Sequence, residues 1–292
     1  MNYFLEVSSM AREYHYLIAG LPDLLIDQDR KDFSLERLRA EMKDHLHPAD
    51  YMQVEQLFLE FDNANFQNHI FNRNQQFNPD STIPENYYAE LEEHIGMFPS
   101  YIQEFYRYFK GGNEGDEDDD NKVFKSRVEK NPEVVFQEYF FSYMGNSRNF
   151  FIASWYGFLR DFNNILTAIS CRKQGIDVAT QLVGEGELVD TLIRSQAADF
   201  GLKKEIGYLE QLLQIADLND IMEREKRIDL LKWSKIDEIV TFDYFNIHAI
   251  LAFLVKAIIV NRWLKLDAQI GSEMFKKMVN DLRESYSLPK EF

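Results

Sequence analysis

Hydrophobic and polar positions along the chain repeat mainly at the three- and four-residue spacing of α-helices. The clearest case starts at Phe151 and continues as one apolar stripe: Trp155, Phe158, Leu159, Phe162, Ile165, Leu166 and Ile169. Gly175 follows as the expected C-terminal cap, since glycine readily adopts the left-handed conformation. Strand-like alternation is hard to find, and proline and glycine are scarce. We therefore expect an all-α protein.

Further helices are expected on both sides of this one. Residues 202–213 place Ile206, Leu209, Leu212 and Leu213 on one side, which predicts a second strong helix. Asn131 is expected to cap a helix starting at Pro132, and Pro84 to start another after the polar stretch 72–84. The alternating charges within 217–233 are typical of a solvated helix face.

The most apolar segment runs from Ile247 to Val260. It is too short to span a bilayer and is interrupted by His248 and Lys256, so it predicts a buried helix. His248 is interpreted as a hydrogen-bonded core histidine. The first seven residues lack the basic start and apolar stretch of a secretory signal, so secretion is not expected.

The length of 292 residues is compatible with a single all-helical domain, 1–292. Residues 111–121 are glycine-rich and acidic, and they predict a mobile loop because the ligand spacing of a calcium loop is absent. The pattern Asp-x-x-Asn-Ile occurs twice, at 161–165 and 243–247, on two helix-like stretches. This recurrence predicts a repeated helical unit.

Lys and Arg number 32 and Asp and Glu 49, which gives a formal net charge of −17. This charge repels nucleic acid phosphates and anionic lipids, so neither nucleic acid binding nor direct insertion into a bilayer is expected. A large partner would more readily present Lys and Arg. Cys171 is the single cysteine, which excludes an intrachain disulfide and favours the cytoplasm.

Catalytic chemistry has little support in the sequence. The chain has no Gly-x-x-x-x-Gly-Lys phosphate loop and no Glu-x-x-His pair, and the glycines within 184–186 lack a dinucleotide-binding context. Glu90 with His94, and Asp44 with His47, each supply only two metal ligands and are interpreted as surface residues. We expect no catalytic residue, cofactor or metal, and an inert Cys171 thiol.

One segment resembles a known family. Residues 161–167 read Asp-x-x-Asn-Ile-x-Thr, and Arg172 and Gly175 follow. This arrangement resembles the Asp-Leu-x-Asn-Leu-Lys-Thr helix of the rotary V-type ATPase stalk subunit, called C in bacterial and archaeal complexes and d in eukaryotes. Residues 14–25 are similar to the opening of a bacterial family associated with V-type ATP synthases. The matching positions are Tyr14, Tyr16, Gly20, Pro22, Asp23, Asp161, Asn164, Thr167, Arg172 and Gly175, with Asp243 and Asn246 in the second copy.

The resemblance implies a funnel-like helical body of about three similar lobes, which we place at 1–110, 122–200 and 201–292. It implies a non-catalytic central-stalk subunit that couples the central shaft to the membrane rotor ring during ion transport. The protein would then be cytoplasmic and peripheral on the membrane, with shaft subunits and rotor ring as partners. Asp161, Asn164 and Arg172 would serve helix packing and capping.

Two other functions are compatible with the sequence. An all-helical adaptor or scaffold unrelated to the rotary complex would share the stripe pattern without associating with ATPase subunits. A helical enzyme with a metal held by carboxylates would draw on the acidic composition and on Glu90 and His94. Metal analysis of protein purified without chelators distinguishes this enzyme from the other two.

Overall fold

The computed structural model describes residues 12–26, 33–111 and 130–285, with side chains as far as Leu266. Within these residues the secondary structure is helical and contains no strand, which confirms the all-α prediction. The α-helices are α1 (His15–Gly20), α2 (Leu35–His45), α3 (Pro48–Ile70), α4 (Glu85–Ala89), α5 (Leu91–His94), α6 (Ser100–Phe109), α7 (Pro132–Gly145), α8 (Phe150–Gln174), α9 (Glu187–Arg194), α10 (Leu209–Ala216), α11 (Ile221–Ile239) and α12 (Ile247–Ser285). Two 3₁₀ turns, η1 (Ile95–Met97) and η2 (Val178–Thr180), complete them.

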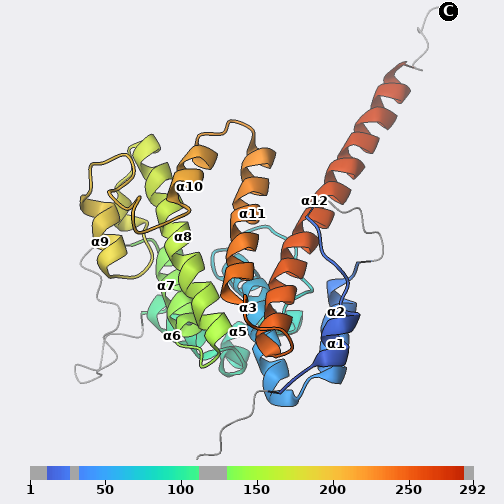
Figure 1. Ribbon diagram of the computed structural model, residues 1–292. Coiled ribbons are helices and arrows are strands. Elements are labelled where there is room, and N and C mark those ends of the chain that lie inside the picture. The colour runs from blue at the N-terminus through green and yellow to red at the C-terminus, as the bar shows by residue number, and fades with distance from the viewer. Residues whose placement is uncertain (1–11, 27–32, 112–129, 286–292) are drawn as a thin grey trace, which may run out of the picture. The chain divides into compact units, whose positions relative to one another are not determined.

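The chain forms two compact units. Unit 1 combines Met1–Tyr51 with Phe245–Phe292, and unit 2 comprises Met52–Tyr244. In unit 1, α2 packs against α12. In unit 2, α7 packs against both α6 and α8, and α10 and α11 pack against α8 (Figure 1). The division into three lobes stays a prediction.

Aromatic side chains form much of the core of unit 2. Phe66 of α3 stacks on Phe136 of α7 with ring centroids 5.4 Å apart, and Phe105 of α6 meets Phe136 edge-on at 5.0 Å. All three side chains are fully buried. Such ring pairs add a directional contribution to the burial of apolar area, which fixes how α3, α6 and α7 pack.

The helix α8 follows the sequence prediction closely. Asn149 caps its start, since the Asn149 Oδ1 accepts from the Ile152 amide at 3.0 Å. Gly175 ends it with φ 69°, in the left-handed conformation. Trp155, Phe162 and Ile165 of the predicted stripe are buried. The helix is therefore defined by caps at both ends and by one apolar face.

Both starts predicted at prolines are confirmed. Asn131 caps α7 through a 3.0 Å bond from the Glu133 amide to its Oδ1. Pro84 is the N-cap residue of α4. The polar stretch before Pro84 is bound to α3, where Asp62 accepts from the Ile83 amide at 3.0 Å and from the Tyr88 hydroxyl at 2.7 Å.

The predicted helix over 202–213 was wrong in its first half. Residues 202–208 form turns, and α10 begins only at Leu209. Phe200 and Gly201 have positive φ, 55° and 76°, which a right-handed helix excludes. Gly207 adds a further cost of about 1 kcal/mol to a helical conformation. The helical spacing of apolar residues thus begins before Leu209, where the helix itself begins.

The charge-rich segment near 217–233 begins its helix at Ile221. Asp220 is the N-cap residue, because its Oδ1 accepts from the Met222 amide at 2.8 Å and the Glu223 amide at 3.1 Å. Glu223 then pairs with Arg227 one turn later at 2.6 Å. An ion pair at this spacing is typical of a helix surface. Several charged side chains of the segment are nevertheless only half-exposed.

The two copies of the Asp-x-x-Asn-Ile pattern adopt different structures. Asp161 and Asn164 lie in the middle of α8. Asp243 and Asn246 precede α12, and the Asn246 Oδ1 accepts from the His248 amide at 3.0 Å. The second asparagine therefore has the role of an N-cap, and the prediction that both copies lie on helices was wrong.

The apolar segment that starts at Ile247 is longer than expected. It belongs to a helix of 39 residues, and Ile247–Leu266 is long and apolar enough to cross a membrane by those two measures alone. Ile250 and Leu254 are nevertheless fully buried within the protein. His248 is half-buried rather than part of the core. The acidic loop predicted at 111–121 lies outside the described residues apart from Gly111.

Candidate interaction site

The motif residues of α8 bind the chain that follows this helix. Asn164 is almost completely buried. Its Nδ2 donates to the Val183 carbonyl at 2.9 Å, and its Oδ1 accepts from the Val183 amide at 2.8 Å. One side chain thus satisfies both polar groups of a single residue, 19 positions further along the chain. We call residues 176–201, which carry Val183, the clamped segment.

A buried ion pair binds the same part of the clamped segment. Lys130 and Glu138 form this pair with side chains 7% and 3% exposed. The Lys130 ammonium also donates to the Leu182 carbonyl at 3.0 Å, and Glu138 Oε1 accepts from the Gly184 amide at 3.0 Å. These added bonds offset part of the desolvation cost of the two charges.

Arg172 holds the far end of the clamped segment. Its guanidinium donates to the carbonyls of Ser195 at 2.5 Å and Ala197 at 2.6 Å, and it lies 3.6 Å from the centroid of the Phe200 ring. Phe200 is buried and has φ 55°, a strained conformation for a non-glycine residue. Desolvation lowers the pKa of Arg172, yet a guanidinium remains charged at neutral pH.

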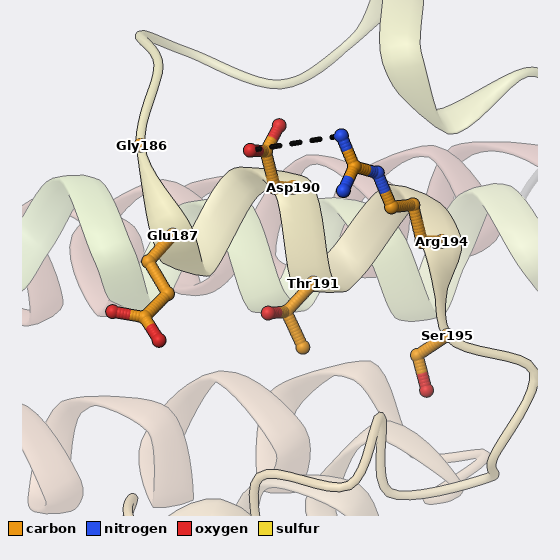
Figure 2. Close-up of a pocket in the computed structure, with 6 residues that line it drawn as sticks. All are labelled: Gly186, Glu187, Asp190, Thr191, Arg194 and Ser195. Atoms are coloured by element: carbon orange, nitrogen blue, oxygen red, sulfur yellow. Dashed lines mark ion pairs between the residues drawn. The ribbon is translucent and has the colours of Figure 1, made fainter.

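Helix α9 and an adjacent recess lie between these two sets of contacts. The recess has a volume of about 590 Å³ and is lined by Gly186, Glu187, Asp190, Thr191, Arg194 and Ser195. Figure 2 shows Glu187, Thr191 and Ser195 on one side of the helix and Asp190 with Arg194 on the other. Asp190 and Arg194 are 4.0 Å apart and largely exposed, so their attraction is weak.

The recess is lined mainly by polar and charged side chains. Its lining combines carboxylates, hydroxyls and one guanidinium, and it contains no histidine or cysteine. No cluster of three potential metal-ligating side chains occurs among the described residues. Glu90 and His94 form a pair 3.2 Å apart near the protein surface, and the ring of His94 stacks on Tyr87.

Cys171 is buried, and the glycines at 184–186 lie in the turn that leads into α9. Cys171 is 4% exposed, and burial together with the nearby Asp177 raises the pKa of its thiol. Gly184 has φ 80°, and Gly186 is the residue before the first turn of α9. His47 accepts from the Ala49 amide at 3.2 Å, a local turn contact at the start of α3.

Two further motif residues, Asp161 and Thr167, lie on α8. Asp161 pairs with its neighbour Arg160 at 2.9 Å, and Thr167 is half-buried. Asn164, Arg172 and Gly175 are thus the members that organise the chain after the helix, through two clamps and a cap.

The motif residues near the N-terminus lie in unit 1. The Tyr14 hydroxyl donates to Asp50 at 2.5 Å, while Tyr16 is 97% exposed. Gly20 ends α1, and Pro22 and Asp23 follow as exposed residues. The structure therefore divides the motif residues between the two units, and those of unit 1 do not line the recess.

Sequence reasoning missed Lys130, Glu138 and the residues that line the recess. The signal for Glu138 was its position within the aromatic run of α7, where a carboxylate faces the core and requires a partner. No sequence spacing connects Lys130 with Leu182, because their contact joins positions 52 residues apart.

Helical secondary structure, a segment clamped by buried polar contacts and a polar recess together define an all-α protein with a candidate binding surface. A family model described as "Protein of unknown function (DUF2764)" matches residues 10–286, so the chain belongs to this family. No curated protein and no solved structure is significantly similar to the chain.

Proposed function

We propose that the protein is a non-catalytic central-stalk subunit of a V-type ATPase or ATP synthase, which couples the central shaft to the membrane rotor ring. The observation that carries the proposal is the set of contacts made by the residues that resemble the stalk family. Asn164, Arg172 and Gly175 fasten and cap one helix and the segment after it. That structural role is the one the resemblance implies for them.

Mechanical coupling requires parts that deform little under load. Helix α8 has 25 residues, a length of about 38 Å at the usual rise per residue. The clamped segment contains only one short α-helix and one 3₁₀ turn, so by itself it would be compliant. Its buried bonds to Lys130, Glu138 and Asn164 transmit displacement to α7 and α8.

Charge supports a partner rich in Lys and Arg. The net charge of −17 favours encounter with a basic shaft, and this attraction weakens as salt screens it. Attachment through the complex places the protein on the cytoplasmic face of the membrane without a bilayer-spanning segment. The burial of Ile250 and Leu254 in α12 agrees with that arrangement, since both side chains already have protein neighbours.

Gentle solubilisation of native membranes that carry a tagged copy tests the proposal. Recovery of the catalytic head, the shaft and the rotor-ring subunits in stoichiometric amounts is the expected result. The control is an equally tagged protein of the same membranes that does not belong to the rotary complex. Recovery of the protein alone, from membranes in which an intact rotary complex lacks it, would overturn the stalk assignment and favour a free-standing scaffold.

A further inference from the structure

Among the described residues of unit 2, the outer face of α9 carries exposed side chains. Val189 and Leu192 bury the inner face of this helix. Glu187, Asp190 and Arg194 are exposed, with Glu187 on the side of Thr191 and with Asp190 and Arg194 on the other side (Figure 2). Within the described chain, Asp190 and Arg194 contact only each other in an ion pair, and no basic side chain pairs with Glu187.

The recess beside this face presents a row of hydrogen-bond acceptors. Glu187, Thr191 and Ser195 follow one another at intervals of four residues and point to the same side in Figure 2. Four residues of helix correspond to about 6 Å, so the row extends over about 12 Å. A carboxylate accepts only, and hydroxyls accept readily, so the row matches cationic donors at a similar spacing.

The charge of the surrounding chain has the sign that such donors require. Residues 176–201 contain five acidic side chains and one basic one. Basic side chains four residues apart on a partner helix repeat at the same spacing of about 6 Å. Arginine suits this surface especially, because its planar guanidinium can bind a carboxylate and a hydroxyl together.

The recess is also held in place before any partner arrives. Asn164 and the Lys130–Glu138 pair bind the chain before α9, and Arg172 binds the carbonyls of Ser195 and Ala197 after it. A surface fixed at both ends loses little conformational entropy on binding. The contacts that stabilise the fold here therefore also preorganise the exposed side of α9 for docking.

We infer that the side of α9 that carries Glu187, Thr191 and Ser195 docks a Lys- and Arg-rich helical segment of a protein partner, with Glu187 as the main charged contact. The inference rests on the proposed function, in which that partner is the central shaft. Thr191 and Ser195 accept from the same cationic side chains. Asp190 and Arg194 lie on the other side of α9. Their charges restrict how far the partner helix can shift along α9.

Binding of purified full-length protein to the purified shaft subunits of the same V-type ATPase tests this inference. Glu187→Lys is expected to raise the Kd about tenfold and to reduce its dependence on salt, since an attraction becomes a repulsion. Glu104→Lys is the matched control, because Glu104 is an exposed residue of α6 that makes the same charge change without lining the recess. This control is expected to change the Kd less than about threefold.

A second variant guards against a folding defect at the start of α9. Thr191→Arg leaves the first turn of the helix intact and introduces a bulky cation into the recess, so it is expected to weaken binding at least as much. Thermal unfolding of each variant shows whether the fold is retained.

The outcomes separate the two proposals. Binding that Glu187→Lys and Thr191→Arg leave unchanged, or that Glu104→Lys weakens equally, overturns the docking surface and leaves the stalk function standing. A wild-type protein that does not bind the shaft overturns both.

Discussion

At the scale of single residues, buried polar groups of unit 2 are satisfied by partners far away in sequence. Asn164 is the clearest example, because it satisfies both backbone groups of Val183. A buried donor or acceptor that loses its partner costs about 1–3 kcal/mol. The stability of the clamped segment therefore depends on a small number of side chains.

Asn164→Ala is expected to lower the free energy of unfolding by about 2–3 kcal/mol, because the amide and carbonyl of Val183 lose their partners in a buried site. Urea denaturation followed by circular dichroism measures this change. Asn163→Ala is the matched control, since Asn163 is exposed on the same helix and is expected to cost less than about 0.5 kcal/mol. Equal losses in the two variants would contradict the role given to Asn164.

Cys171 is expected to react slowly with thiol reagents in the folded protein. Burial hides its sulfur and raises the pKa of the thiol, which reduces the fraction of reactive thiolate at pH 8. Because the raised pKa favours the thiol form, its contribution to stability is present below the unfolded pKa of about 8.5 and is lost as pH rises through the folded value.

Colour development with an aromatic disulfide reagent measures the reactivity of Cys171 in native and urea-unfolded protein. A native rate at least about a hundredfold lower is expected, since both access and thiolate content fall on folding. Cys171→Ala should abolish the signal in both states. Comparable native and unfolded rates would show that the thiol is accessible, contrary to the structure.

At the scale of helices, caps determine where the elements of unit 2 end. Gly175 has φ 69° and Gly157 lies inside α8, yet an added Cβ would meet no atom within 4 Å at either position. The two glycines therefore differ in backbone conformation alone. Substitution at both positions therefore compares a left-handed residue with a right-handed helical one, without a steric contact at either.

Gly175→Ala is expected to destabilise the protein by about 1 kcal/mol, because an alanine in the left-handed region is strained. Gly157→Ala is expected to stabilise it by about 0.5–1 kcal/mol, since alanine favours the helix interior and restricts the unfolded chain. Thermal unfolding of both variants under one condition measures the difference. The same sign for both changes would contradict the assignment of Gly175 as the cap.

Local chemistry explains which helices the sequence predicted. Asn131 and Gly175 are cap residues with strong conformational preferences, so the limits of α7 and α8 could be read from neighbouring residues. The turns over 202–208 follow Phe200, which has positive φ and lies against the guanidinium of Arg172. That contact joins residues 28 positions apart, and apolar spacing carries no information about it.

The candidate site escaped prediction for the same reason. Asn164 and Arg172 were singled out by their resemblance to a family helix, but their partners Val183, Ser195 and Ala197 are recognised only in the folded chain. The recess beside α9 forms only because long-range contacts hold the clamped segment in place. The spacing of apolar residues can place α9 residues on one side of a helix. It does not reveal whether that side packs against other described residues.

At the scale of the whole molecule, α12 combines the length and apolar character of a membrane span with burial inside the protein. Its segment Ile247–Leu266 has the length and apolar character of a membrane span, and 44% of its most apolar window is buried within the protein. Ile250, Leu251 and Leu254 are fully buried. These side chains already contribute to a protein core, so their transfer into lipid would first require that core to open.

Leu254→Ala is therefore expected to lower the free energy of unfolding by about 2–5 kcal/mol, the usual cost of a truncated core leucine. Ile258→Ala, at a half-buried position of the same helix, is expected to cost less. Urea denaturation of detergent-free protein measures both. Under the proposed stalk function, alkaline carbonate is expected to release the native protein from membranes, because protein contacts alone would hold it there. Retention in the carbonate-washed membrane, together with a negligible effect of Leu254→Ala, would show that α12 lies in lipid.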